Sequence, residues 1–161
     1  MCLSVSPGGA VVVSAPYASA TESVERFVRE HMLWIERAVQ KMMGYVPMPE
    51  HGRTAYLKHR EAARALVCQK ILKWNQIYHF AHGRIAIKNS KRTWGSCSHK
   101  NNLNFSYAIV FLPPHLADYL VVHELCHLKE HNHSSAFWGL IESELPNYRE
   151  LRKELRTYIL K

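Results

Sequence analysis

The chain is organised around one short stretch, His123-Glu124-Leu125-Cys126-His127, with a further histidine at His133. Just upstream, Pro113-Pro114 predicts the start of a helix, because proline is tolerated in a first helical turn. Apolar residues then recur at helical spacing, at Leu116, Leu120, Val121, Leu125 and Leu128. The stretch is therefore predicted to lie on a helix with an apolar face.

The spacing of the two histidines indicates a metal site. His123 and His127 are four residues apart, so on a helix their imidazoles project from the same side, one turn apart. Glu124 lies roughly 100° around the axis from His123, where its carboxylate can reach a position beside a metal without being a ligand. A scrambled chain of this composition would contain the pattern about one time in twenty, so the predicted helix around it carries much of the weight. The pattern is typical of zinc hydrolases, in which the glutamate activates a metal-bound water.

A third ligand has to come from outside this helical turn. If the helix continued, His131 would lie about 12 Å from His123 along the axis. That is too far for a single ion, because zinc lies about 2.0–2.1 Å from each ligand nitrogen. His133 is therefore predicted to reach back from beyond the helix, with Asn132 in a left-handed conformation turning the chain.

The helix that follows offers an alternative third ligand. Ser134 is predicted to be the N-cap of a helix over Ser135–Leu145. Glu142 or Glu144 on that helix is the alternative to His133.

Other motifs accompany the central stretch. They are Trp94-Gly95-Ser96-Cys97-Ser98, the extension of the central stretch to Asp118 and Leu128, Asn132-His133-Ser134, Phe137-Trp138, and a strand ending in Ser14-Ala15-Pro16 before a helix that carries Phe27-Val28 and Trp34-Ile35. Together these motifs resemble the YgjP-like metallopeptidase family, which is related to the SprT-like and Wss1-like zincins. The resemblance covers roughly residues 5 to 158.

The resemblance implies an α+β, zincin-like fold, in which a small antiparallel β-sheet packs on helices and the central stretch carries the metal site. It implies His123, His127 and His133 as metal ligands and Glu124 as the catalytic base. The implied cofactor is one Zn²⁺ per chain, with other divalent metals as alternatives. The implied domain is a single one over residues 1–161, and an N-terminal strand that family members usually have is expected to be lacking.

Length and composition fit a globular protein in a reducing compartment. A chain of 161 residues fits one domain with a sizeable core. No apolar run approaches the ~20 residues of a membrane helix, and no basic signal region follows Met1. The four cysteines form no C-x-x-C pair and are interpreted as free thiols, Cys97 and Cys126 as packed side chains rather than ligands. We therefore expect a cytoplasmic protein without a membrane partner.

The net charge of +8 raises the question of an anionic partner. Basic residues form two modest clusters, one of Lys88, Lys91 and Arg92 and one of Lys58, His59, Arg60 and Arg64. No nucleic-acid-binding fold signature accompanies them, so a solvated basic surface is the preferred interpretation and a functional anion site the alternative.

The rest of the chain predicts the remaining elements. Residues 1–9 are expected to be a polar segment ending in a turn, followed by a strand over Ala10–Ser14, one helix from a cap at Thr21 or Ser23 to Gly44, a loop to Arg53, and a helix over 54–80. Strands near Ile85, over Trp94–Ser98 and over Leu103–Phe111 are expected to form an antiparallel meander. A closing helix after Pro146 is expected to include Tyr158 and Ile159.

Three further residue groups carry hypotheses. Trp94–Ser98 is expected to line the cleft and to hold an extended peptide by main-chain hydrogen bonds, the alternative being a tightly packed turn. Asp118, the only aspartate, suits the helix dipole, the alternative being a group that orients a ligand. One of the basic residues Arg149, Arg152, Lys153 and Arg156 could reach the site to stabilise an oxyanion.

Three functions compete. The leading hypothesis is a zinc-dependent peptidase acting on a peptide or protein, in which Glu124 takes the proton of the metal-bound water. The second is a metal-dependent nucleotide or phosphoanhydride hydrolase, which the positive charge would suit. The third is a non-enzymatic, metal-stabilised nucleic-acid-binding module. Glu124 beside the ligands argues against that module, because structural zinc sites are normally closed by four protein ligands.

Overall fold

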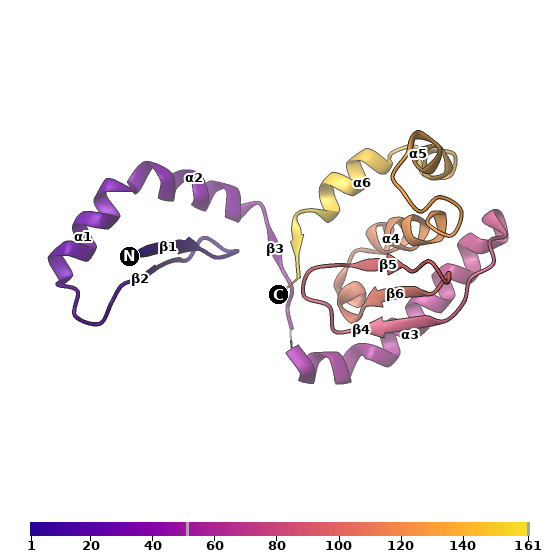
Figure 1. The fold of residues 1–161 in the computed structure, drawn as a ribbon, viewed down its shortest axis with the longest axis horizontal. Helices are drawn as coiled ribbons and strands as arrows, with labels where there is room; N and C mark the ends of the chain where they lie inside the picture. The colour runs from indigo at the N-terminus through magenta and orange to yellow at the C-terminus, as the bar shows by residue number, and fades with distance from the viewer. Residues whose placement is uncertain (51, 161) are drawn as a thin grey trace. The chain divides into compact units, whose positions relative to one another are not determined.

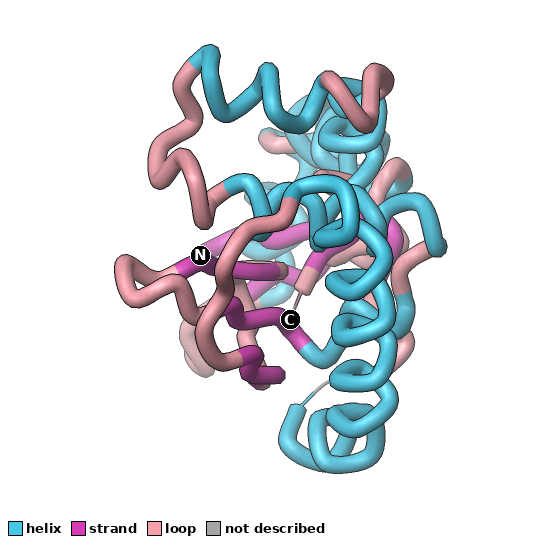
Figure 2. Tube along the Cα trace, turned by 90° about the vertical axis from the view of Figure 1, so that its right-hand side faces the viewer, coloured by secondary structure: helices cyan, strands magenta, loops and turns pink. Residues whose placement is uncertain are grey.

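The computed structural model describes residues 1–50 and 52–160 (Figure 1). It divides into two compact units, one of Met1–Pro47 with Thr157–Ile159 and one of Met48–Arg156 with Leu160. Helices make up most of the regular structure (Figure 2). None of the described helices combines the length and the apolarity that crossing a membrane requires.

The first unit combines a hairpin with two helices. Strand β1 (Cys2–Val5) pairs antiparallel with β2 (Val11–Ser14), and Gly8 and Gly9 take positive φ angles of 94° and 83° in the turn between them. Helices α1 (Thr21–Glu30) and α2 (Met32–Met43) follow, and β3 (Val46–Pro47) pairs in parallel with β7 (Tyr158–Ile159). The predicted turn thus lies between two strands, and β1 occupies part of the segment for which only polar character was predicted. One prediction is wrong: Tyr158 and Ile159 leave the closing helix for a strand, which their high β-propensity favours.

The predicted single helix before Gly44 is interrupted at His31. The His31 Nδ1 lies 2.8 Å from the carbonyl oxygen of Phe27, the group that would accept the next helical hydrogen bond, and the backbone N–H of His31 donates to Val28 instead. The N-cap is Ala20, so the predicted cap at Thr21 or Ser23 is wrong, whereas Gly44 does end α2. A side chain that competes for a backbone acceptor explains the break.

The second unit packs a three-stranded sheet against helices (Figure 1). Its elements are α3 (Gly52–Tyr78), β4 (Ile85–Lys88), β5 (Gly95–Cys97), β6 (Leu103–Ser106), a 3₁₀ turn (Tyr107–Phe111), α4 (Pro114–Cys126), α5 (Ser135–Glu142) and α6 (Tyr148–Leu155). The central strand is β6, in which Leu103 and Phe105 are almost completely buried. The two edge strands are β4 and β5.

The sheet differs from the predicted antiparallel meander. β5 pairs antiparallel with β6, but β4 pairs with β6 in parallel, so the connection from β4 to β5 crosses β6. The strand predicted over Leu103–Phe111 stops at Ser106, whose hydroxyl accepts a hydrogen bond from the N–H of Ala108 and begins the 3₁₀ turn. Apolar alternation alone does not distinguish these two ways of burying the same residues.

Helix α4 forms the centre of this unit. It begins with Pro114 in its first turn, as predicted, and nine of its thirteen residues are buried. Asp118 on α4 accepts a hydrogen bond from the indole N–H of Trp74 at 2.8 Å and pairs with Lys70 at 2.9 Å. Asp118 therefore joins α4 to α3, and its hydrogen-bond and ion-pair partners in the described chain are Trp74, Lys70 and Lys73, all on α3.

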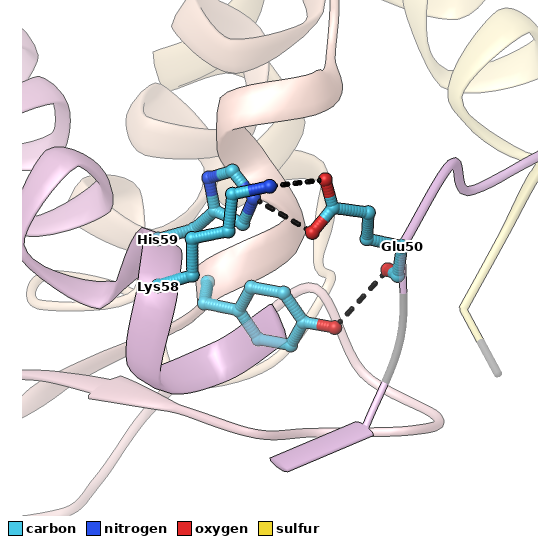
Figure 3. Close-up of polar contacts among 4 residues, drawn as sticks. Glu50, Lys58 and His59 are labelled. Carbon is cyan, nitrogen blue, oxygen red and sulfur yellow. Dashed lines mark hydrogen bonds and ion pairs between the residues drawn. The ribbon is translucent and has the colours of Figure 1, made fainter. Parts of the chain in front are cut away.

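The segment before α3 is fixed by one glutamate (Figure 3). The carboxylate of Glu50 accepts a hydrogen bond from Lys58 Nζ at 2.7 Å and lies 3.1 Å from His59 Nε2, and these contacts lower its pKa. The Glu50 carbonyl oxygen accepts the hydroxyl of Tyr107 at 3.2 Å. Two members of the second basic cluster are therefore engaged by a carboxylate within the chain.

Candidate metal centre and active site

Helix α4 and its C-terminal end position two of the histidines. His123 lies in the last turn of α4 and His127 is its C-cap. The Nδ1 of His127 lies 3.0 Å from the carbonyl oxygen of Glu130, so this nitrogen carries the proton and donates. The other ring nitrogen, Nε2, is then left with its lone pair available to a metal ion.

The chain turns back directly after α4 and brings His133 to the same place. Helix α4 ends at Cys126, earlier than predicted, and Asn132 does not take the left-handed conformation expected of it. Ser134 caps α5 by accepting a hydrogen bond from the N–H of Phe137, as predicted, and α5 ends at Glu142. The early helix end and this cap together direct His133 towards the two helical histidines.

One ligand atom from each of His123, His127 and His133 lies within 4.8 Å of the other two. The Nε2 atoms of His133 and His123 are 3.2 Å apart. A tetrahedral zinc ion with bonds of about 2.0–2.1 Å would place two ligand nitrogens about 3.3 Å apart. Burial, the charges of the other two histidines and Arg152 lower the pKa of His123 to about 3, so its ring is neutral, as a ligand must be. The three side chains therefore fit a divalent metal ion.

The alternative ligands lie elsewhere. Neither Glu142 nor Glu144 joins the group that could hold a metal among the described residues, and Glu142 pairs with Arg149 at 3.7 Å. His131 lines the same cavity as the triad but is not part of the group.

Glu124 lies beside the triad with its carboxylate buried. Glu124 is only 4% exposed. In the described part of the chain, two buried side-chain polar atoms have no hydrogen-bond partner, Glu124 Oε2 and His123 Nδ1. Buried polar atoms are nearly always satisfied, so an unsatisfied pair at one place indicates a functional site. Burial raises the pKa of Glu124 to about 8.

Strand β5 packs directly on this carboxylate through Gly95. A Cβ atom at Gly95 would lie 2.5 Å from Glu124 Oε1 and 2.7 Å from both Cδ and Cγ. A side chain at this position would displace the Glu124 carboxylate, so glycine allows β5 to pack this closely. The sequence predicted that Trp94–Ser98 either lines the cleft or forms a tightly packed turn. Gly95 packs tightly on Glu124 and also lines the cavity over the triad.

A cavity of about 290 Å³ opens over the triad. It is lined by Gly95, Ser96, Cys97, His123, Glu124, His127, His131 and His133. Burial, and then the charge of Glu124, raise the pKa of Cys97, and burial raises the pKa of Cys126 to about 12. Both cysteines are therefore protonated thiols, which favours their interpretation as packed side chains.

Aromatic rings surround the three histidines from the α5 side. Phe137 is fully buried, and its ring centre lies 5.0, 4.5 and 4.8 Å from those of His123, His127 and His133. Trp138 stacks on His133 at 5.4 Å with an angle of 25° between the rings. Sequence motifs included this Phe-Trp pair, but helical spacing alone gave no reason to place both rings against the metal site.

Of the four basic residues that the sequence offered, Arg152 is the one whose contacts link it to the site. Its guanidinium carbon lies 4.7 Å from the ring centre of Trp138. Burial is the main cause that lowers the pKa of both His123 and His133, and the charge of Arg152 lowers it further. The sequence could not choose among the four candidates, because the choice depends on how α6 is rotated.

Comparison with known proteins agrees with this architecture. The family model for the YgjP-like metallopeptidase domain matches residues 52–158. The crystal structure of the metallopeptidase zymogen abylysin from Pyrococcus abyssi is 24% identical, with a TM-score of 0.50, over 59% of this chain and 92% of that one. The zymogen of jannalysin from Methanocaldococcus jannaschii is 22% identical, with a TM-score of 0.47, over 58% and 93%. No curated protein sequence matches the chain.

Fold and family together define a metallopeptidase domain, and so a metal-dependent hydrolase. The chain belongs to the YgjP-like metallopeptidase family. The predicted α+β, zincin-like fold class is confirmed. Family membership implies a divalent metal ion, and the histidine triad could hold one.

Replacing Gly95 by alanine is expected to impair catalysis without removing the metal. The new methyl group would overlap the Glu124 side chain at 2.5–2.7 Å, and the buried carboxylate has little room to move. A displacement of about 1 Å of a reacting group can cost about 100-fold in rate, so we expect a loss of that order in kcat/KM. Steady-state kinetics and zinc content are measured together.

The matched control for this substitution is Gly139→Ala. Gly139 lies in α5, and a Cβ added there meets nothing within 4 Å. Its activity should equal that of the unchanged chain. Equal activity of Gly95→Ala would show that β5 does not constrain Glu124.

Proposed function

We propose that this chain is a zinc-dependent peptidase, with zinc held by His123, His127 and His133 and with Glu124 as the general base. The observation that carries the proposal is the convergence of three imidazoles within 4.8 Å beside a buried carboxylate that lacks a hydrogen-bond partner. Three nitrogen ligands with an open position are typical of catalytic rather than structural zinc, and imidazole suits zinc better than calcium or magnesium.

When bound, the metal ion would lower the pKa of a water molecule towards 7 and polarise the carbonyl of a peptide bond. Glu124 then accepts the proton of the attacking water on a carboxylate oxygen and delivers it to the nitrogen of the leaving amine. Its burial supports both steps, because a carboxyl group with a pKa raised to about 8 can accept and return a proton near neutral pH. A metal ion held by the three histidines would favour the ionised form of Glu124, which accepts the proton first.

The free edge of β5 is proposed to bind the substrate backbone. Ser106 N donates to Trp94 O, and Ser98 N donates to Asn102 O, so positions 94 and 98 hydrogen-bond to β6 and to the residue just before it. Ladder bonds alternate along an antiparallel pair, so the backbone groups of Gly95 and Cys97 face away from β6. An extended peptide can pair with this edge as an added strand, next to the cavity that these residues line.

The alternative of a nucleotide hydrolase receives less support. It depended on basic residues near the metal, yet Lys88, Lys91 and Arg92 do not line the cavity over the triad. The lining is made of histidines, one carboxylate and a strand edge. Polyphosphate recognition would need cations directed into this space.

Metal removal tests the proposed function. We expect cleavage of a mixed peptide library, followed by mass spectrometry, to fall by at least about 100-fold after chelation and dialysis, because the metal supplies several kcal/mol of transition-state stabilisation. Addition of one equivalent of zinc should restore the rate, whereas calcium should not. Glu124→Gln, purified and treated in the same way, gives the cleavage rate that contaminating peptidases contribute. Unchanged cleavage after complete removal of the metal would contradict the proposal.

A further inference from the structure

A layer of stacked side chains joins α6 to the histidine triad. Trp138 stacks on His133 at 5.4 Å, and the guanidinium carbon of Arg152 lies 4.7 Å from the Trp138 ring centre. Tyr148 also stacks on Trp138, at 5.2 Å and 15°. Arg152 does not itself line the cavity over the triad, but it is held beside the site by an aromatic ring that contacts a proposed metal ligand.

The guanidinium of Arg152 pairs with no carboxylate in the described chain. Arg152 is exposed, and it forms no ion pair with any residue that the structure describes. By contrast, Arg149 on the same helix pairs with Glu142 at 3.7 Å. A guanidinium stacked on an indole keeps its N–H edge available, and that planar fork matches the two oxygens of a carboxylate.

We propose that Arg152 forms a subsite that binds a carboxylate of the peptide substrate, supplied by an acidic side chain or by a free C-terminus. The inference rests on the proposed peptidase function and adds a preference among peptides. Arg152 would act as a specificity-determining residue.

The contacts limit where that carboxylate lies. Two successive contacts, of 4.7 Å and 5.4 Å, separate the guanidinium carbon from the ring centre of His133. An extended chain advances about 3.3–3.6 Å per residue, so about three residues span this path. The carboxylate should therefore lie within about three residues of the cleaved bond.

A second cation at the C-terminal end of α6 supports an anion site at this place. Arg156, the C-cap of α6, follows Arg152 by four residues, and both charges act on Tyr119, whose ring lies 5.9 Å from that of His123. Like charges four residues apart on a helix destabilise it. A bound carboxylate would relieve this repulsion.

The test compares one peptide library in two forms, with its carboxylates intact and with all of them converted to methylamides. The full zinc-loaded chain digests both forms, and mass spectrometry gives the rates and the cleaved positions. We expect the intact form to be cleaved about tenfold faster or more, the contribution of a charge-assisted hydrogen bond. In Arg152→Ala this ratio should fall to about one.

Two further variants separate charge from packing. Lys153→Ala removes one positive charge from the same helix and should leave the ratio of the two cleavage rates as it is in the unchanged chain. Arg152→Gln keeps a long polar side chain beside Trp138 without the charge. Its ratio of the two cleavage rates should fall as in Arg152→Ala, while its zinc content stays unchanged. A general structural defect lowers both rates together and leaves their ratio in place.

The cleaved positions identify the source of the carboxylate. Aspartate or glutamate enriched at one fixed position indicates a side chain, and cleavage at a fixed distance from the end indicates the C-terminus; either supports the inference. A ratio in Arg152→Ala equal to that of the unchanged chain overturns it while leaving the proposed function intact. Absence of cleavage of both forms by the zinc-loaded, unchanged chain overturns the proposed function and this inference with it.

Discussion

Glu124→Gln is expected to lower kcat by about 10²- to 10⁴-fold, the usual contribution of a general base, while zinc stays bound. Glutamine has nearly the same shape but cannot accept the proton of the attacking water. The residue is 4% exposed, and its burial disfavours the charged carboxylate, so a neutral amide should not lower the thermal stability of the fold. Single-turnover kinetics, zinc content and the melting temperature are measured on one preparation.

The control for this substitution is Glu130→Gln. Glu130 lies in the same turn region, but its contact with His127 is made by its backbone carbonyl, which the substitution leaves in place. Its kcat should be unchanged. If Glu124→Gln cleaved peptides as fast as the unchanged chain with zinc bound, another group would be the base.

His133→Ala is expected to weaken zinc binding by more than about 100-fold. Loss of an outer-shell partner of a metal site costs about 10–100-fold in affinity, and a direct ligand should cost more. His133 comes from a loop, so its removal leaves α4 and the other two histidines in place. Competition with a chromophoric chelator measures the affinity, and circular dichroism should show the same helix content.

His131→Ala is the matched control, because His131 lines the same cavity two residues away but is not part of the triad. It should bind zinc as the unchanged chain does. Full zinc affinity in His133→Ala would return Glu142 and Glu144 to consideration as the third ligand.

The sequence predicted the core of the fold from local signals. Pro114 and the apolar spacing placed α4, Ser134 placed the cap of α5, and Gly44 placed the end of α2. These local signals do not determine which strands pair or in which direction. The parallel pairing of β4 with β6 depends on a connection that crosses the sheet, and apolar alternation is the same in either arrangement.

Within the candidate site, spacing along one helix was more informative than contacts between elements. The four-residue spacing of His123 and His127 is fixed by the helix itself. The early end of α4 and the packing of Gly95 on Glu124 depend on tertiary structure. The place of Arg152 among four basic candidates likewise depends on the rotation of α6 against Trp138. Such features become visible only when separate elements are brought together.

The metal content of the purified chain is the sharpest test of the proposed zinc site. Elemental mass spectrometry should find about one zinc per chain, either as purified or after dialysis against a zinc buffer, as expected for one site of three imidazoles. His131→Ala should give the same value and His133→Ala a lower one. A chain that holds no zinc and takes none up from the buffer, while remaining folded, would contradict the zinc site and the peptidase mechanism built on it.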